Sequence, residues 1–198
     1  MNPTKLMAVA LCAAACVTTT AFAEDDFLVD SATPKAIAEP VNPKPGLVFK
    51  GYAQKCLMGE KFKDVASVLA NATPVKTTVV TTDKFSFEGF LNNLKIEQGV
   101  WEGFLKCKRS AKCTILVKQK NVYGSGFQLY VNGKWVAGGF DQRSGDVDMK
   151  PGFNHIKIIS QKKAPVEVFL SPSGSTKEPK ALSPAMMFYD DKPEDDVI

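Results

Sequence analysis

Histidine is nearly absent from this sequence, since His155 is the only one among 198 residues. Histidine titrates near neutral pH and is the usual general base, but a catalytic base needs a positioned partner, and the sequence indicates none. Only Cys56, Cys107 and Cys113 follow the first 23 residues. These scattered cysteines and one histidine do not have the spacing of a zinc site. We therefore predict no catalytic residues, no bound metal and no cofactor.

Long hydrophobic runs and a large net charge are also missing. The apolar stretch at residues 6–17 is well short of the roughly 20 residues that a membrane-spanning helix needs, and no other stretch approaches that length. The formal net charge is only +4. A nucleic-acid-binding protein is expected to show a concentrated basic face. The composition therefore argues against a membrane span and against nucleic acid as a partner.

The first 23 residues have the three parts of a secretory signal peptide. Lys5 gives a positive start, residues 6–17 form a short apolar middle, and Ala21-Phe22-Ala23 is a small-x-small cleavage site before the acidic Glu24. We expect cleavage after Ala23 and a secreted or periplasmic protein, with the cell surface as a further possibility. Cys16, which follows three alanines, leaves acylation as a lipoprotein open as an alternative.

Composition divides the rest of the chain into three parts. Residues 24–45 form a Pro-rich linker, with Pro34, Pro40, Pro43 and Pro45 among small and charged residues, a composition that does not build a packed core. Residues 46–190 have the length of one domain. Residues 191–198 are an acidic tail, which we expect to be solvated.

Strand-like runs fill most of residues 46–190. Asn132-Gly133 separates two such runs and predicts a two-residue hairpin, because a type I′ turn needs positive φ at both positions. Residues 60–71 have helical spacing and predict one short helix. Many short strands with turn signals between them predict an all-β protein, a mostly antiparallel β-sandwich. The predicted strands are residues 46–52, 76–82, 85–90, 100–105, 114–118, 127–131, 134–137, 146–149, 154–160 and 166–170.

Export makes disulfide bonds possible. Cys107 and Cys113 flank five residues, and in a hairpin their side chains would face each other across its neck. We predict a disulfide between them that stabilises the fold by about 2–2.5 kcal/mol. Cys56 is then unpaired, and it either packs as a small apolar residue or links two chains into an oligomer.

Four parts of the sequence, in this order and spacing, resemble a PA14-type domain, a β-sandwich module of toxins, adhesins and glycan-processing enzymes. The likeness covers about residues 45–190 and implies a PA14-like sandwich that binds rather than catalyses, since such domains are accessory units in enzymes. The parts that carry it are residues 45–52, residues 100–105 with 113–117, residues 126–136 and residues 147–158.

The resemblance also implies where a sugar site would lie. Sugar-binding members of the family hold calcium with an Asp pair, and this pair falls on Gly124 and Ser125 here. Neither residue offers a carboxylate, whereas Ca²⁺ prefers several charged or carbonyl oxygen ligands. We therefore do not expect calcium-dependent sugar binding at this position.

Four residues are candidate ligand contacts. Trp135 lies beside the Asn-Gly turn, where an exposed indole can stack on a sugar or meet a partner. Asp146 and Asp148 share one face of a strand and, with Asp141, form the densest acidic group of the domain. The alternative is that these carboxylates are simply solvated. Trp101 matches a core position of the family and is expected to be buried.

Basic residues surround the cysteine pair. Lys106, Lys108, Arg109 and Lys112 can meet an anionic surface, or they can simply keep the turn soluble and discourage edge pairing. The sequence as a whole predicts an exported, non-catalytic module that binds an envelope or surface protein, or a glycan. The alternative is a structural subunit of a secretion, conjugation or pilus assembly. A hydrolase is disfavoured because the exported chain leaves no room for a catalytic domain.

Overall fold

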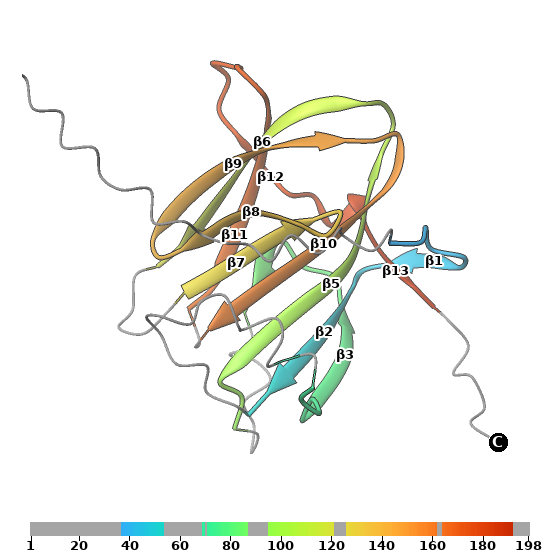
Figure 1. Cartoon of the computed structure of the whole chain (residues 1–198), viewed down its shortest axis with the longest axis vertical. Helices are drawn as coiled ribbons and strands as arrows, with labels where there is room; N and C mark the ends of the chain where they lie inside the picture. The colour runs from blue at the N-terminus through green and yellow to red at the C-terminus, as the bar shows by residue number, and fades with distance from the viewer. Residues whose placement is uncertain are drawn as a thin grey trace, which may run out of the picture. The chain divides into compact units, whose positions relative to one another are not determined.

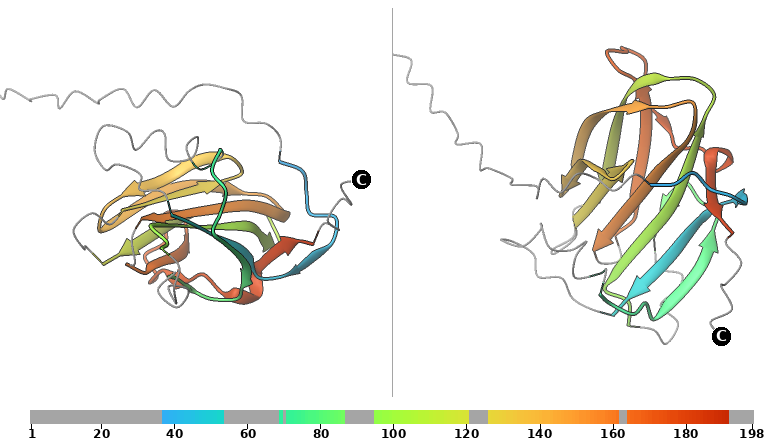
Figure 2. Two further views of the ribbon diagram at one scale, coloured as in Figure 1. Left: turned by 90° about the horizontal axis from the view of Figure 1, so that it is seen from below. Right: turned by 45° about the vertical axis from the view of Figure 1, so that its right-hand side comes forward.

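The computed structural model describes residues 37–53, 69, 71–86, 95–120, 126–161 and 164–191. These residues form two antiparallel sheets (Figure 1) that lie as two layers with a shared core (Figure 2). The predicted all-β sandwich is therefore confirmed. The predicted helix at residues 60–71 lies outside the described residues except at its end, where Leu69 is helical. No helix among the described residues is long and apolar enough to cross a membrane.

The larger sheet, sheet A, has β5 (Gln98–Cys107) and β10 (Gly152–Gln161) at its centre. All ten residues of β5 pair with β10, and Figure 1 shows the two strands side by side. The other strands of sheet A are β1 (Pro43–Pro45), β2 (Leu47–Tyr52), β3 (Lys76–Val80), β7 (Gly126–Val131), β8 (Lys134–Gly139) and β13 (Met187–Asp190).

The smaller sheet, sheet B, is built around β6 (Ala111–Gln119), which pairs with β9 (Gln142–Met149) and β11 (Val166–Pro172). Two short strands, β4 (Lys84–Phe85) and β12 (Lys180–Ala181), pair with β11. A 3₁₀ turn, η3 (Pro184–Met186), precedes β13. Within the predicted strand at residues 85–90, only Phe85 is in a strand, and residues 87–90 lie outside the described part.

The core lies between the two sheets because strand residues alternate between an inward apolar face and an outward face. Trp101 is fully buried, as predicted, with its ring 5.1 Å from Phe49 and 5.8 Å from Phe85, measured between centroids. Leu105 of the same strand and Ile156 of β10 are also fully buried. The inward side of the β5–β10 pair is therefore the centre of the core.

The Asn132-Gly133 hairpin forms as predicted between β7 and β8. Asn132 has φ of 50° and Gly133 has φ of 77°, the left-handed values that a type I′ turn requires. The Asn132 side chain then ties the turn to β10, since its Nδ2 donates to Asn154 Oδ1 at 3.0 Å and its Oδ1 accepts from the His155 backbone N–H at 2.9 Å.

The hairpin predicted around the cysteines is wrong. Cys107 ends β5 in sheet A, whereas Cys113 lies in β6 of sheet B, so the turn between them crosses from one sheet to the other. Long pairing ladders with β10 and β9 hold β5 and β6 apart. Both cysteines are free thiols in the structure, so the predicted disulfide is not formed in it. Burial and then the charge of Cys113 raise the pKa of Cys107.

The two segments next to the domain boundaries also join the sandwich. Pro43 and Pro45, in the predicted linker, belong to β1, which pairs with β13. Proline is tolerated there because an edge strand leaves one side unpaired. Asp191, in the predicted tail, donates its backbone N–H to the Asn42 carbonyl at 3.1 Å.

Gly145 of β9 in sheet B lies against the backbone of β8 in sheet A. A Cβ at this position would collide with the backbone carbonyl of Val136 in β8. We predict that Gly145→Ala lowers the free energy of unfolding by about 1–3 kcal/mol, as overpacking of a core does. Urea denaturation measures the effect. The neighbouring, exposed Ser144→Ala is the matched control, and an equal effect in both variants would contradict the close packing.

Candidate functional site

The outward face of sheet A carries polar and aromatic side chains at its centre. The register of β5 and β10 sets Glu102 opposite Lys157 and Phe104 opposite His155. Residues directly opposite each other in an antiparallel pair point to the same side. On β2, Val48 lies opposite Glu102. Lys50 is two residues further along β2, so its side chain lies on the same face as Glu102. The Glu102 carboxylate is therefore surrounded by four side chains from three strands, those of Phe104, His155, Lys157 and Lys50.

Glu102 is the centre of this charge cluster. His155 Nε2 lies 3.2 Å from Glu102 Oε1, and Lys157 Nζ lies 3.7 Å from the same oxygen. The hydrogen bond with His155 is the largest influence, and with the charges of Lys157, His155 and Lys50 it outweighs burial and lowers the pKa of Glu102 to about 2. Glu102 is thus a permanent anion at neutral pH.

His155 is held rather than free. Its side chain is only 11% exposed, its ring packs edge-on against Phe104 at 5.6 Å between centroids, and its Nε2 contacts Glu102. The other ring nitrogen, Nδ1, is buried and has no hydrogen-bond partner in the structure. This arrangement fixes the imidazole in place beside a carboxylate.

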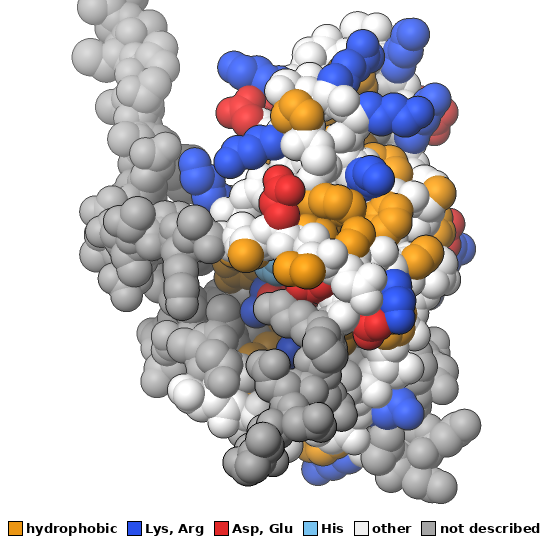
Figure 3. All heavy atoms as spheres, turned by 90° about the vertical axis from the view of Figure 1, so that its right-hand side faces the viewer, with side chains coloured by type: hydrophobic (Ala, Val, Ile, Leu, Met, Phe, Trp, Pro, Cys, Tyr) orange, Lys and Arg blue, Asp and Glu red, His pale blue; other side chains and the backbone are white. Residues whose placement is uncertain are grey.

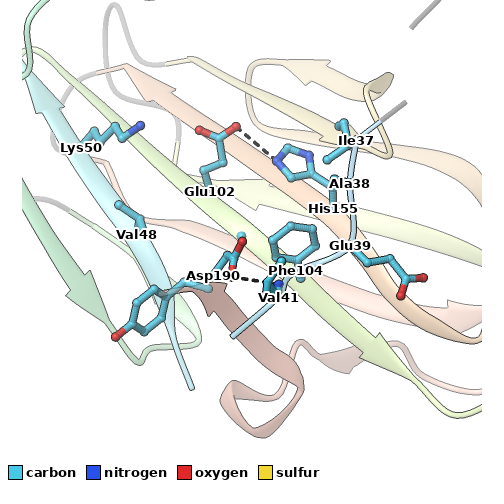
Figure 4. Close-up of a pocket in the computed structure, with 12 residues that line it drawn as sticks. Ile37, Ala38, Glu39, Val41, Val48, Lys50, Glu102, Phe104, His155 and Asp190 are labelled. Atoms are coloured by element: carbon cyan, nitrogen blue, oxygen red, sulfur yellow. Dashed lines mark hydrogen bonds and ion pairs between the residues drawn. The ribbon is translucent and has the colours of Figure 1, made fainter. Parts of the chain in front are cut away.

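Two cavities open on this face, and both are lined by Lys50 and Glu102. The first, of about 380 Å³, lies between the charge cluster and a strap formed by residues 37–42, as Figure 4 shows. The second, of about 240 Å³, is bounded by Tyr52, Leu69 and Pro74. Because the two cavities share a floor, we call them together the outer groove.

The strap is fixed to the sheet at one end. The backbone N–H groups of Val41 and Asn42 donate to Asp190 Oδ1 at 3.0 and 2.9 Å, and Lys44 forms an ion pair with Asp191. Ile37 and Val41 are nevertheless exposed, at 43% and 89%. The strap therefore forms one wall of the outer groove, and its own apolar side chains reach solvent.

The ligand contacts predicted from sequence are not brought together. Trp135 is 44% exposed and lies opposite Tyr130, on the outward side of sheet A. Asp146 and Asp148 are exposed on β9 of sheet B, where Asp146 accepts a hydrogen bond from Thr114 Oγ1 at 2.6 Å. Asp141 precedes β9, at the end of that strand away from Asp148. No group of three potential metal ligands occurs among the described residues.

The charge cluster itself was missed from the sequence. His155 and Lys157 are two residues apart, so they share a face of one strand, and Glu102 lies on alternate positions to the core residues of β5. This alternation is the only feature of the local sequence that points to the cluster. Glu102 and His155 are 53 residues apart in the chain, so the sequence near either residue does not indicate the other. Cys56, Gly124 and Ser125, which carried other predictions, lie outside the described residues.

The lowered pKa of Glu102 gives a prediction about pH. Because its pKa in the folded protein is about 2 rather than 4.5, its stabilising effect is complete above pH 4.5 and is lost as the pH falls through 2. We expect Glu102→Gln to lower the free energy of unfolding at pH 7 by about 1–2 kcal/mol after solvent screening. The difference from the unmodified protein should shrink between pH 5 and 2.

Urea denaturation across this pH range measures the effect. Glu97→Gln is the matched control, because the Glu97 carboxylate has no ion pair in the part of the chain that the structure describes. A difference between the Glu102 variant and the unmodified protein that stays constant from pH 7 to 2 would contradict the ion-paired geometry.

Comparisons with known proteins identify the fold. No family model and no curated protein matches the sequence. Among solved structures, the PA14 domain of the antifreeze protein MpAFP matches with a TM-score of 0.56 and 13% identity, over 81% of this chain and 99% of that one. The A domain of epithelial adhesin 9 from Candida glabrata, solved with Galβ1-3GlcNAc, matches with a TM-score of 0.56 and 10% identity, over 81% and 97% of the chains.

A third match is the PA14 sugar-binding domain of an RTX adhesin, with a TM-score of 0.52 and 15% identity, over 73% of this chain and 98% of that one. At such low identity these structures share the fold with this chain and nothing finer. They agree with the two-sheet architecture of the described residues. The chain therefore has a PA14-like fold.

Proposed function

We propose that this chain is an exported, non-catalytic binding module that engages a protein or a glycan of the cell envelope through the outer groove. The observation that carries the proposal is the charge cluster of Glu102, His155, Lys157 and Lys50 on the floor of that groove. A partly exposed surface with fixed charges and adjoining aromatic rings offers orientation and contact area to a ligand.

The chemistry of the groove favours binding over catalysis. Glu102 is ionised at neutral pH and is held by the His155 ring and the Lys157 ammonium group, so it is a poor proton donor. Among the residues that the structure describes, the lining of the two cavities includes no serine, threonine or cysteine that His155 would activate as a nucleophile. Both features support a recognition surface.

Two kinds of partner fit a module of this fold. The RTX adhesin domain is described as sugar-binding, and the A domains of the Candida glabrata adhesins were solved with a disaccharide. These descriptions support a glycan. The replacement of the family's calcium carboxylates by Gly124 and Ser125 favours a protein, so the proposal covers both until the partner is captured.

A second candidate function is a structural subunit of an envelope assembly. The observation that favours it is the pairing of Asn42 with Asp191, and of β1 with β13. Residues 42–45 and 188–191 therefore lie side by side at one edge of sheet A. Neighbouring subunits would then be tethered from one edge of the domain.

The binding proposal is tested with the protein lacking its signal peptide, used as bait in envelope extracts and on a glycan array with and without calcium. We expect Lys50→Met to weaken binding of the captured partner about tenfold, or ~1.4 kcal/mol, because it removes a groove charge while keeping the aliphatic stem. Lys95→Met, at an exposed lysine outside the groove, is the matched control. Equal binding by both variants would refute the groove as the binding site.

Export has its own test. We expect the protein recovered from the periplasm or the medium to begin at Glu24. In that compartment Cys107 and Cys113, which the turn between β5 and β6 connects, would pass two electrons and two protons to an oxidised thiol–disulfide oxidoreductase and form the bridge. Mass spectrometry of the unreduced protein checks both expectations. An intact N-terminus argues against export, and alkylation of both thiols before reduction excludes the bridge.

A further inference from the structure

A second surface lies outside the outer groove, in a part of the chain without carboxylates. No aspartate or glutamate occurs from residue 103 to residue 140, whereas the same stretch holds seven basic residues. This stretch therefore carries an excess of positive charge, although Asp148 of β9 lies opposite Lys112 and Glu167 of β11 lies opposite Lys118. The basic residues are Lys106, Lys108, Arg109, Lys112, Lys118, Lys120 and Lys134.

The fold concentrates this charge at one end of the sandwich. The turn between β5 and β6 and the turn between β9 and β10 meet there, since Cys107 pairs with Gly152, and Figure 2 shows both turns at the same end. The second turn adds Lys150. We call the resulting group the basic end, formed by Lys106, Lys108, Arg109, Lys112 and Lys150, all of which are exposed.

The positive charge of the basic end is available to a partner. None of its five side chains has a carboxylate within 4.0 Å among the described residues. The turn that carries Lys150 is also held in shape, because Asn154 Oδ1 accepts from the Lys150 backbone N–H at 2.9 Å and Asn154 Nδ2 donates to the Lys150 carbonyl at 2.8 Å.

Aromatic rings adjoin these charges on the outward face of sheet A. Phe153 is 6.2 Å from Phe104 and 5.6 Å from Phe188 between ring centroids. Lys106 Nζ lies 5.4 Å from the Phe153 ring and 5.8 Å from the Phe188 ring. All three rings are partly exposed. Figure 3 shows basic side chains gathered at the upper end of one face, above a group of hydrophobic side chains.

We propose that the basic end docks the protein on a membrane surface that carries anionic phospholipids. Groups of four to eight basic residues are the usual footprint of such binding, and aromatic rings are enriched at the level of lipid headgroups. Contact with the headgroups would use the lysines and Arg109 of the two turns, with Phe153 and Phe188 beside them. The protein would lie on the membrane without crossing it.

The shape of the surface favours a membrane over a linear polyanion. Two adjacent turns project from the end of a sandwich, which suits a flat partner, whereas a linear polyanion is normally held along a groove. The outer groove is lined by Lys50, Glu102, His155 and other residues, and none of the five basic residues lines it. Docking at the basic end would therefore leave that groove open to a second partner.

The test measures binding of the purified protein, without its signal peptide, to two kinds of vesicle. One kind is phosphatidylcholine mixed with phosphatidylglycerol, and the other is phosphatidylcholine alone. We expect binding to the anionic vesicles only, with loss of binding as salt is raised. The double variant Lys108→Glu/Arg109→Glu should lower the partition coefficient at least about 25-fold, or about fivefold for each charge removed.

The matched control is Lys76→Glu/Lys95→Glu, which makes the same change in net charge. Both lysines lie near the start of β5, about 30 Å from the basic end at the usual rise of a strand. The control should change vesicle binding less than about twofold, since several Debye lengths separate it from the basic end. Equal losses in the two double variants, or equal binding to both kinds of vesicle, would overturn the proposal.

A further arm uses an immobilised anionic polysaccharide. Retention on the polysaccharide, without binding to anionic vesicles, would also overturn membrane docking. Thermal unfolding of each variant shows whether it is folded. Lys50→Met in the groove should leave vesicle binding unchanged, so failure of the membrane proposal and failure of the groove proposal give different results.

Discussion

The ten-residue antiparallel ladder between β5 and β10 is the constraint on which the rest of the structure depends. Its inward side buries Trp101, Leu105 and Ile156 in the core, and its outward side sets Glu102 beside His155 and Lys157. A slip of one residue would turn every side chain of one strand to the opposite face. The apolar core therefore fixes the register, and the register in turn assembles the charge cluster.

The same ladder connects the two proposed surfaces. Its middle forms the floor of the outer groove, and its end at the Cys107–Gly152 pair leads into the two turns of the basic end. A ligand in the groove and a membrane at the turns would contact different residues of the same two strands. This arrangement is consistent with a module that holds a partner close to a surface, using a PA14-like sandwich as a rigid frame.

Local patterns in the sequence were enough to predict the β-sandwich and the Asn132-Gly133 hairpin, because both depend on residues close in the chain. The burial of Trp101 was predicted from the resemblance to PA14-type domains. Local patterns were not enough for the cysteine turn, since the spacing of Cys107 and Cys113 does not tell whether a turn stays in one sheet or crosses to the other. The pairing of Glu102 with His155 depends on a register between distant strands, which the apolar alternation alone leaves open. The strap was missed because Pro40 and the prolines on either side of the strap favoured a linker.

The pKa of the Glu102 side chain tests the charge cluster most directly. A titration of the carboxyl carbon by nuclear magnetic resonance, assigned by comparison with Glu102→Gln, measures it in the folded protein. The structure predicts a pKa of about 2, with His155 as the main cause. A value near 4.5, the ordinary pKa of a glutamate carboxyl, would contradict the register, the charge cluster and the floor of the outer groove together.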